Sequence, residues 1–127
     1  MGYSPSDMEF LNTKNAAARE IALAFGVPPM LLGLPGDNTY SNYQEANRAF
    51  YRQTVLPLVT KTAYAVACWL SEAPAVNVAI EPDLDAIPAL SVEREALWKR
   101  VGDATFLSDN EKRAMLGLPP AAPGASG

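Results

Sequence analysis

Two acidic side chains separated by one residue, Asp83 and Asp85, are the pair in this sequence best suited to chemistry. Paired carboxylates can hold a cation or act together as acid and base. This pair follows Pro82 in a short turn, where aspartates are typically solvated turn residues. We therefore expect no catalytic residue, metal site or cofactor from it.

The sequence has no histidine and one cysteine, Cys68. Cys68 lies in an apolar helical run, 63–70, which predicts a core thiol that packs like a small hydrophobic side chain. Without histidine, zinc sites and the usual nucleophile–base pairs are missing. We expect a protein that is not an enzyme.

The charge pattern limits the partners. The net charge is −4, and the lysines and arginines form no basic stripe. This argues against tight binding to a phosphate backbone but allows a surface past which DNA slides. No apolar run reaches the roughly 18 residues of a membrane span. The start, 1–3, has no signal-peptide pattern and the single cysteine fits a reducing compartment, so we expect no membrane contact and a soluble intracellular protein.

The first elements follow from their end signals. Ser6 and Glu9 have capping-box spacing and open a helix predicted over 5–25, which Gly26 ends in a left-handed conformation. A single helical turn is predicted from Pro29 to Leu32, ended by Gly33. The loop 34–41 follows, because its proline, glycine and asparagine residues favour turns.

A long helix is predicted over 42–71, with Asn42 and Glu45 as its capping pair. Leu58, Val66 and Trp69 lie on its apolar side, which needs neighbours. Pro57 predicts a kink near Leu56–Pro57, because an interior proline loses one hydrogen bond and clashes with the preceding turn.

The rest of the chain is predicted to hold one strand and two helices. Alternation over 76–81 indicates a short strand whose partner is missing or comes from another subunit. A helix over 91–101 is capped by Ser91 and closed by Gly102, and the box Ser108–Glu111 starts a helix over 109–116. Residues 121–127 are predicted to be a disordered tail. The fold class is mainly α: a long kinked helix with shorter helices and one short strand.

Two stretches resemble a known family. The first contains, in order, Met8-Glu9-Phe10-Leu11, Arg19-Glu20-Ile21-Ala22, Phe25-Gly26-Val27-Pro28-Pro29-Met30-Leu31-Leu32-Gly33 and Tyr40-Ser41-Asn42. The second contains Leu107-Ser108-Asp109-Asn110-Glu111-Lys112-Arg113 and Gly117-Leu118-Pro119-Pro120. Together they resemble the C-terminal part of portal proteins of tailed bacteriophages, and the loop 34–40 is especially similar to portals of gene transfer agents, the phage-like particles of alpha-proteobacteria.

The resemblance implies a portal, or head–tail connector, subunit of a virion. Such subunits form a dodecameric ring at a capsid vertex, the channel for DNA packaging and for ejection of the viral genome. Implied partners are other copies of the chain, capsid and head–tail adaptor proteins, terminase, and double-stranded DNA bound without sequence preference. Terminase docks through a clip that this chain is expected to lack, together with the first stem helix and the N-terminal wing. The chain is then an excised fragment or the product of a truncated gene.

The same resemblance divides the chain into parts of a portal. Residues 1–33 resemble a stem helix with its Pro-Pro turn, 34–41 a channel loop, 42–82 a wing helix with a strand, and 83–120 the crown. The resemblance implies that the channel loop faces DNA through Asp37, Asn38, Thr39 and Tyr40, although Tyr40 is also suited to packing ahead of the Asn42 helix start.

Four further residues are candidate subunit contacts. Trp69 and Trp98 suit core or subunit contacts better than stacking on bases. Arg48 and Arg52, four residues apart on the polar side of the long helix, are solvated charges or partners in salt bridges between subunits. The alternative function, from a different class, is a helical protein-interaction or adaptor module unrelated to virions.

Overall fold

The computed structural model describes residues 2, 4–34, 40–74 and 76–123, and it is mainly α-helical as predicted. The chain divides into two compact units, Met1–Pro82 and Asp83–Gly127. Each unit is described by itself below.

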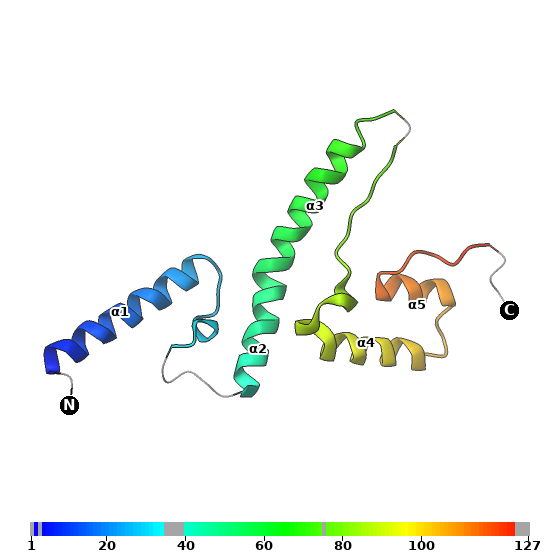
Figure 1. Cartoon of the computed structure of the whole chain (residues 1–127). Helices are drawn as coiled ribbons and strands as arrows, with labels where there is room; N and C mark the ends of the chain where they lie inside the picture. The colour runs from blue at the N-terminus through cyan, green and yellow to red at the C-terminus, as the bar shows by residue number, and fades with distance from the viewer. Residues whose placement is uncertain (1, 3, 35–39, 75, 124–127) are drawn as a thin grey trace. The chain divides into compact units, whose positions relative to one another are not determined.

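Helix α1 (Pro5–Ala24) opens the first unit (Figure 1). Its N-cap is Ser4, whose hydroxyl accepts the Asp7 N–H at 3.3 Å while the Asp7 carboxylate accepts the Ser4 N–H at 3.3 Å. The capping box predicted at Ser6 and Glu9 is therefore wrong. Because proline is favoured at the first helical position, Pro5 takes that place and the residue before it becomes the cap.

The turn after α1 agrees with the sequence prediction. Gly26 has a φ of +68°, and the 3₁₀ turn η1 (Pro29–Leu32) is closed by Gly33, whose φ is also +68°. Both positions are left-handed, where glycine alone has no steric penalty.

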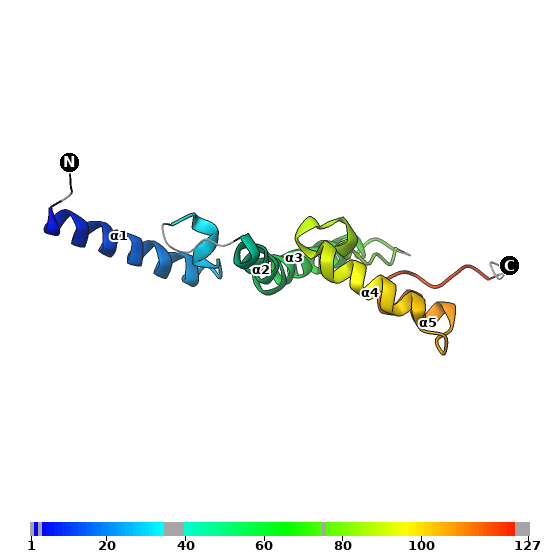
Figure 2. The ribbon, with the colours of Figure 1, turned by 90° about the horizontal axis from the view of Figure 1, so that it is seen from below.

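The long helix is built from three consecutive pieces, α2 (Tyr40–Phe50), the π-helical turn η2 (Tyr51–Val55) and α3 (Leu56–Leu70). They form one rod in Figure 1, and Figure 2 views that rod close to its axis. A kink was predicted near Leu56–Pro57; the structure has a π turn just before the proline, in which the Leu56 N–H bonds to the Tyr51 carbonyl five residues back. Widening the helix there relieves the clash between the proline ring and the preceding turn.

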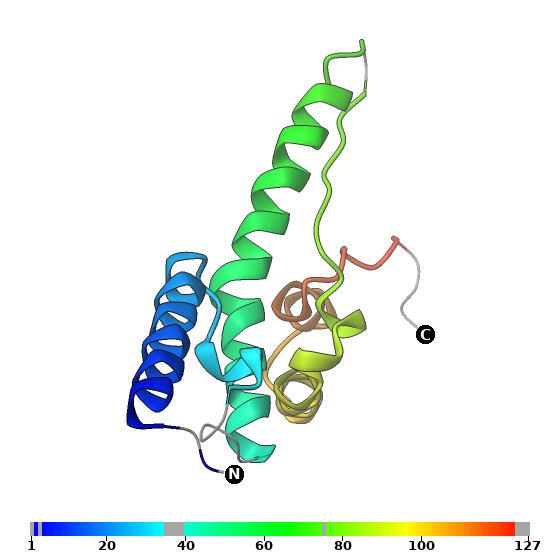
Figure 3. The same cartoon turned by 60° about the vertical axis from the view of Figure 1, so that its left-hand side comes forward.

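Two sequence predictions in this unit are wrong. Asn42 is not a cap, because α2 begins two residues earlier and Asn42 lies inside its first turn. The predicted strand over 76–81 is absent from the described residues; the chain there is extended coil that turns back after α3 (Figure 3). The Val78 N–H bonds to the Ser71 hydroxyl at 3.1 Å, and no second strand is present in the described ranges to complete a ladder.

The second unit contains the short turns η3 (Leu84–Ala86) and η4 (Pro88–Leu90), then α4 (Ser91–Asp103) and α5 (Asp109–Leu116). The predicted capping box is present in α5: the Ser108 hydroxyl accepts the Glu111 N–H at 3.3 Å, the Glu111 carboxylate accepts the Ser108 N–H at 2.8 Å, and Gly117 closes the helix at a φ of +79°.

Helix α4 begins at Ser91 as predicted, but the residues predicted to cap and to close it are wrong. Its N-cap is Leu90 and has no side-chain bond, because η4 leads directly into the helix and Ser91 is already helical at φ −55° and ψ −44°. Gly102 lies inside α4, which ends at Asp103 with Ala104 as its C-cap. Of the predicted disordered tail, 124–127 lie outside the described residues, and the Ala121 N–H bonds to the Asn110 side chain at 3.0 Å.

Few side chains are buried among the described residues. The buried apolar residues are Ala22, Leu56, Ala63 and Ala67 in the first unit and Leu90, Val101 and Leu116 in the second. Several large apolar side chains are instead mostly exposed, among them Phe10, Phe25, Tyr64, Trp69, Val92 and Phe106. Exposed apolar surface on this scale is typical of chains that bury it against partners.

Candidate subunit interface

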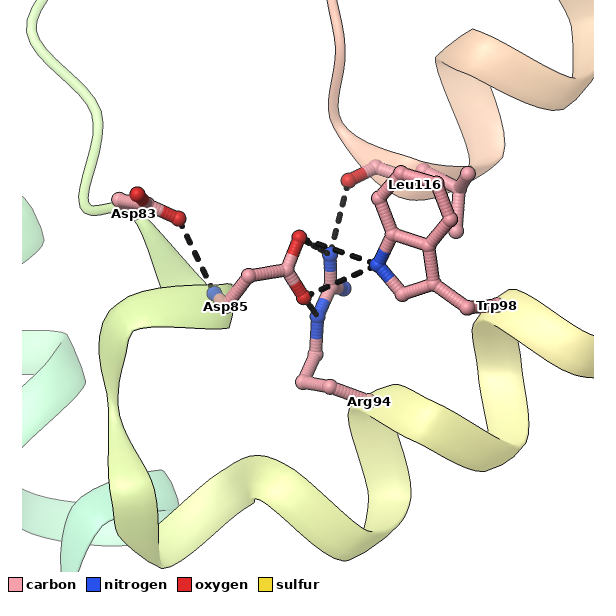
Figure 4. A network of polar contacts seen from close by, with 5 residues as sticks. All are labelled: Asp83, Asp85, Arg94, Trp98 and Leu116. Atoms are coloured by element: carbon pink, nitrogen blue, oxygen red, sulfur yellow. Dashed lines mark hydrogen bonds and ion pairs between the residues drawn. The ribbon is translucent and has the colours of Figure 1, made fainter.

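Arg94 is the only charged side chain among the buried residues of the described part of the chain, at 8% exposure. It reaches from α4 toward η3, where its Nε donates to Asp85 Oδ1 at 2.6 Å and its Nη2 to Asp85 Oδ2 at 3.1 Å (Figure 4). The same Nη2 donates to the carbonyl of Leu116, the last residue of α5, at 2.9 Å. One guanidinium therefore joins η3, α4 and the end of α5.

Asp85 also holds Trp98. The indole Nε1 lies 3.1 Å from each carboxylate oxygen of Asp85, so its hydrogen is shared between them (Figure 4). Arg94, by hydrogen bonding, is the largest influence holding the pKa of Asp85 below its ordinary value, with burial opposing it. The same pairing raises the pKa of Arg94, so both groups stay charged near neutral pH.

The prediction for the acid pair was half right. Asp83 is a turn residue, accepting the Asp85 N–H at 3.1 Å through its side chain. Asp85 is an ion-pair partner, which the sequence did not predict. The local sequence holds Arg94 nine residues on, yet only the fold of η3 against α4 shows that they meet.

Of the four predicted contact residues, Trp98 has the most defined surroundings. Its side chain is 43% exposed and lines a groove of about 460 Å³ between α4 and α5. Trp69, on α3, is 69% exposed and available for a contact. Arg48 forms an ion pair with Glu45 on the exposed face of α2. Arg52 lies in the π turn and is exposed.

The predicted DNA-facing residues fall mostly outside the described part of the chain. Asp37, Asn38 and Thr39 are not among the described residues, and Tyr40 is the first residue of α2. The described ends of this loop are Gly33, which closes η1, and Tyr40, which opens the rod.

Cys68 is exposed, so the prediction of a core thiol is wrong. The apolar run that contains it turns the small residues Ala63 and Ala67 to the buried side of α3. Cys68 lies one turn after Tyr64, and their hydrogen bond is the largest of the influences that raise the pKa of the tyrosine. The described residues contain no group of three or more side chains able to hold a metal ion, and no described helix is long and apolar enough to span a bilayer.

One contact inside the first unit was not predicted from sequence. The Thr54 hydroxyl, in the π turn, donates to the carbonyl of Gly26 at 2.5 Å. It joins the end of α1 to the middle of the rod across 28 residues of sequence. The left-handed Gly26 was a visible signal of a tight turn, but its partner was not.

A chain with exposed apolar helices, a Gly-Val-Pro-Pro turn that begins at the left-handed Gly26 and a long rod with a π turn has the features of an assembly subunit. The defining pattern of the phage portal protein family matches residues 1–117. The chain therefore belongs to the phage portal protein family.

The chain is also similar to individual proteins, one of which is a phage portal protein. The chain is 52% identical over 120 residues to an uncharacterized protein of Rickettsia felis, covering 94% of this chain and 31% of that one. It is 28% identical over 124 residues to the portal protein of Enterobacteria phage HK97, covering 94% of this chain and 29% of that one. The chain thus spans about a third of the length of these relatives.

A solved structure is similar over nearly the whole chain. In the neck of a native gene transfer agent particle, computed with C12 symmetry, one chain is 66% identical and superimposes with a TM-score of 0.72, covering 95% of this chain and 34% of that one. This likeness agrees with the predicted resemblance to gene transfer agents.

Proposed function

We propose that this chain is part of a portal subunit of a phage-like particle, in which copies form a ring at the capsid vertex and double-stranded DNA passes through it during packaging and ejection. The observation that carries the proposal is the 66% identity to a chain in the twelvefold neck of a gene transfer agent particle, over 95% of this chain.

The physical properties support assembly into a ring. Side chains such as Phe25, Trp69 and Phe106 are 75%, 69% and 86% exposed, more than an isolated subunit would leave in water at this size. A ring supplies the missing cover, because each copy contacts a neighbour on either side. Capsid, head–tail adaptor and terminase proteins are the further partners we propose, with a structural and non-enzymatic role for the chain.

The loop 34–41 is proposed to face the channel. It contains no lysine or arginine; its polar residues include Asp37, Asn38 and Thr39, and its last two residues, Tyr40 and Ser41, form the start of α2. Neutral and acidic side chains release no counterions from phosphates, so contact with DNA is weak and depends little on salt. Copies of such a loop around an axis act as a collar that retains DNA and lets it slide. An adaptor module unrelated to virions is disfavoured, since the family pattern matches residues 1–117.

A chimera tests the proposal. The matching third of the gene transfer agent portal is replaced by this chain, and particles are assayed for ring mass and for nuclease-protected DNA. We expect twelvefold rings and protected DNA, whereas a portal with that third deleted gives neither. Chimeric subunits that are soluble but form no ring would contradict the proposal.

A further inference from the structure

The groove between α4 and α5 is a preformed apolar site. Its large apolar lining residues are Trp98, Val101, Leu116 and Leu118, and its volume of about 460 Å³ is enough to hold a large side chain. The charged residues Asp109, Lys112 and Arg113 also line it. Val101 is 1% exposed and Leu116 is 8% exposed, so the floor is packed, while Trp98 remains accessible at 43%.

The groove is held rigid by the charged network beneath it. Asp85 fixes the indole of Trp98, and Arg94 ties Asp85 to the end of α5 through the Leu116 carbonyl (Figure 4). Both walls are therefore positioned before anything binds. Because a preformed site loses little entropy on binding, an aromatic-walled groove of this kind suits the centre of an interface.

The same unit carries a matching projection. Phe106, in the turn between α4 and α5, is 86% exposed, the highest value among the large apolar side chains of the described residues. It does not line the groove beside it. A ring brings two different faces of the same chain together, so a projection on one copy and a groove on the next are the elements it requires.

Charge favours the same pairing. At the groove, Lys112 donates to the Gly102 carbonyl at 3.3 Å and Arg113 to the Pro119 carbonyl at 3.4 Å, and neither has a carboxylate partner among the described residues. Asp109 also lines the groove, so its charged lining has two cations and one carboxylate. On the projecting side, Asp103 ends α4 three residues before Phe106, and the turn 104–108 contains no charged residue. The groove lining therefore has a net positive charge, which is electrostatically complementary to Asp103 beside the projecting Phe106.

From these observations we propose that Phe106 of one subunit docks into the Trp98 groove of the neighbouring subunit in the ring. The proposal rests on the ring of the proposed function. It assigns Trp98 a subunit contact and gives Asp85 and Arg94 the role of positioning residues for that contact.

Photo-crosslinking in assembled rings of portal subunits that carry this chain tests the contact. Replacing Phe106 by p-benzoylphenylalanine keeps an aromatic side chain there and lets it react with whatever it touches. We expect a covalent subunit dimer after illumination, with the attachment mapped by mass spectrometry to peptides containing Trp98 or Leu118. The same amino acid at Val92, which is 71% exposed on α4, is the matched control and should not reach the groove.

Three outcomes with intact rings overturn the docking and leave the proposed function standing: crosslinks elsewhere on the neighbour, crosslinks to a capsid or adaptor protein, and no crosslinks. Failure of the unsubstituted subunit to form rings overturns both. As a second measurement, Phe106→Ala should raise the subunit concentration needed for ring formation by about tenfold, the effect of a central interface anchor. Val92→Ala should change it less than twofold, and equal effects of the two substitutions would also overturn the docking.

Discussion

The hydroxyl of Thr54 lies 2.5 Å from the carbonyl oxygen of Gly26, and a Cβ atom placed on Gly26 would lie 2.7 Å from that same hydroxyl. The turn after α1 and the π turn of the rod are therefore fitted to each other: glycine is required both by its φ of +68° and by the closeness of Thr54. The π turn helps to set this fit. One extra residue in a helix rotates the residues after it by about 100°, and this rotation decides which side chain faces α1.

Gly26→Ala should destabilise the chain by about 1 kcal/mol more than Gly33→Ala. Both substitutions place an alanine in a left-handed conformation, at a cost of about 1–2 kcal/mol. Only Gly26→Ala also displaces Thr54 and its hydrogen bond, worth about 1 kcal/mol, since nothing lies within 4 Å of a Cβ at Gly33. Urea unfolding followed by circular dichroism measures the difference, and equal losses would show that the Thr54 contact is not formed in solution.

Asp85→Asn should remove stability from the second unit in a pH-dependent way. The pKa of Asp85 is lowered in the folded state, so its ionised form stabilises the fold above the ordinary aspartate value of about 3.9. That contribution is lost as the pH falls through the lower folded-state pKa. The gap between wild type and variant should thus be widest near neutral pH and close in strong acid, as measured by Trp98 fluorescence in a Trp69→Phe background.

In an Arg94→Met background, the stability difference between Asp85 and Asp85→Asn should no longer depend on pH, because the guanidinium is the main cause of the lowered pKa of Asp85. Arg94→Met should itself cost about 2 kcal/mol, the typical loss of hydrogen bonds to a charged group. If the wild-type chain keeps the same stability advantage over Asp85→Asn from neutral to strongly acidic pH, that result would contradict the ion pair of Figure 4.

Ser108→Ala should destabilise α5 by about 1 kcal/mol, because it removes one half of a capping box. Ser91→Ala is the matched control. Ser91 opens α4 but makes no capping bond, so its loss should stay within about 0.5 kcal/mol. Thermal unfolding of both variants compares them directly, and a larger loss at Ser91 would mean that it caps α4 after all.

Substituting lysine for Asp37 and Asn38 in an assembled portal should leave the ring intact but slow packaging or ejection. Each new phosphate contact releases counterions, so the plot of the logarithm of the DNA association constant against the logarithm of salt concentration becomes steeper by about 0.9 per contact. DNA release from particles at several salt concentrations measures this effect. Deletion of 35–40 with no change in packaging or DNA retention would show that the loop does not contact the DNA in transit.

Local chemistry determined the elements that the sequence predicted well. Gly26, Gly33 and Gly117 end their helices, and Ser108 with Glu111 starts α5, because these signals act over three or four residues of neighbouring chain. The N-cap of α1 was predicted two residues too late, at Ser6 instead of Ser4, because both serines offer a hydroxyl. The proline at position 5 decides between them.

The tertiary structure decided what depends on residues distant in the chain. The exposure of Cys68, the missing strand over 76–81 and the partners of Asp85 all depend on which surfaces meet, and a periodic pattern in one segment does not specify that. The sequence by itself therefore determined the family, the helical class and the glycine-ended turns. Packing determined the Thr54–Gly26 contact and the Arg94 network, because hydrogen bonds across 28 and 22 residues exist only once the helices are placed.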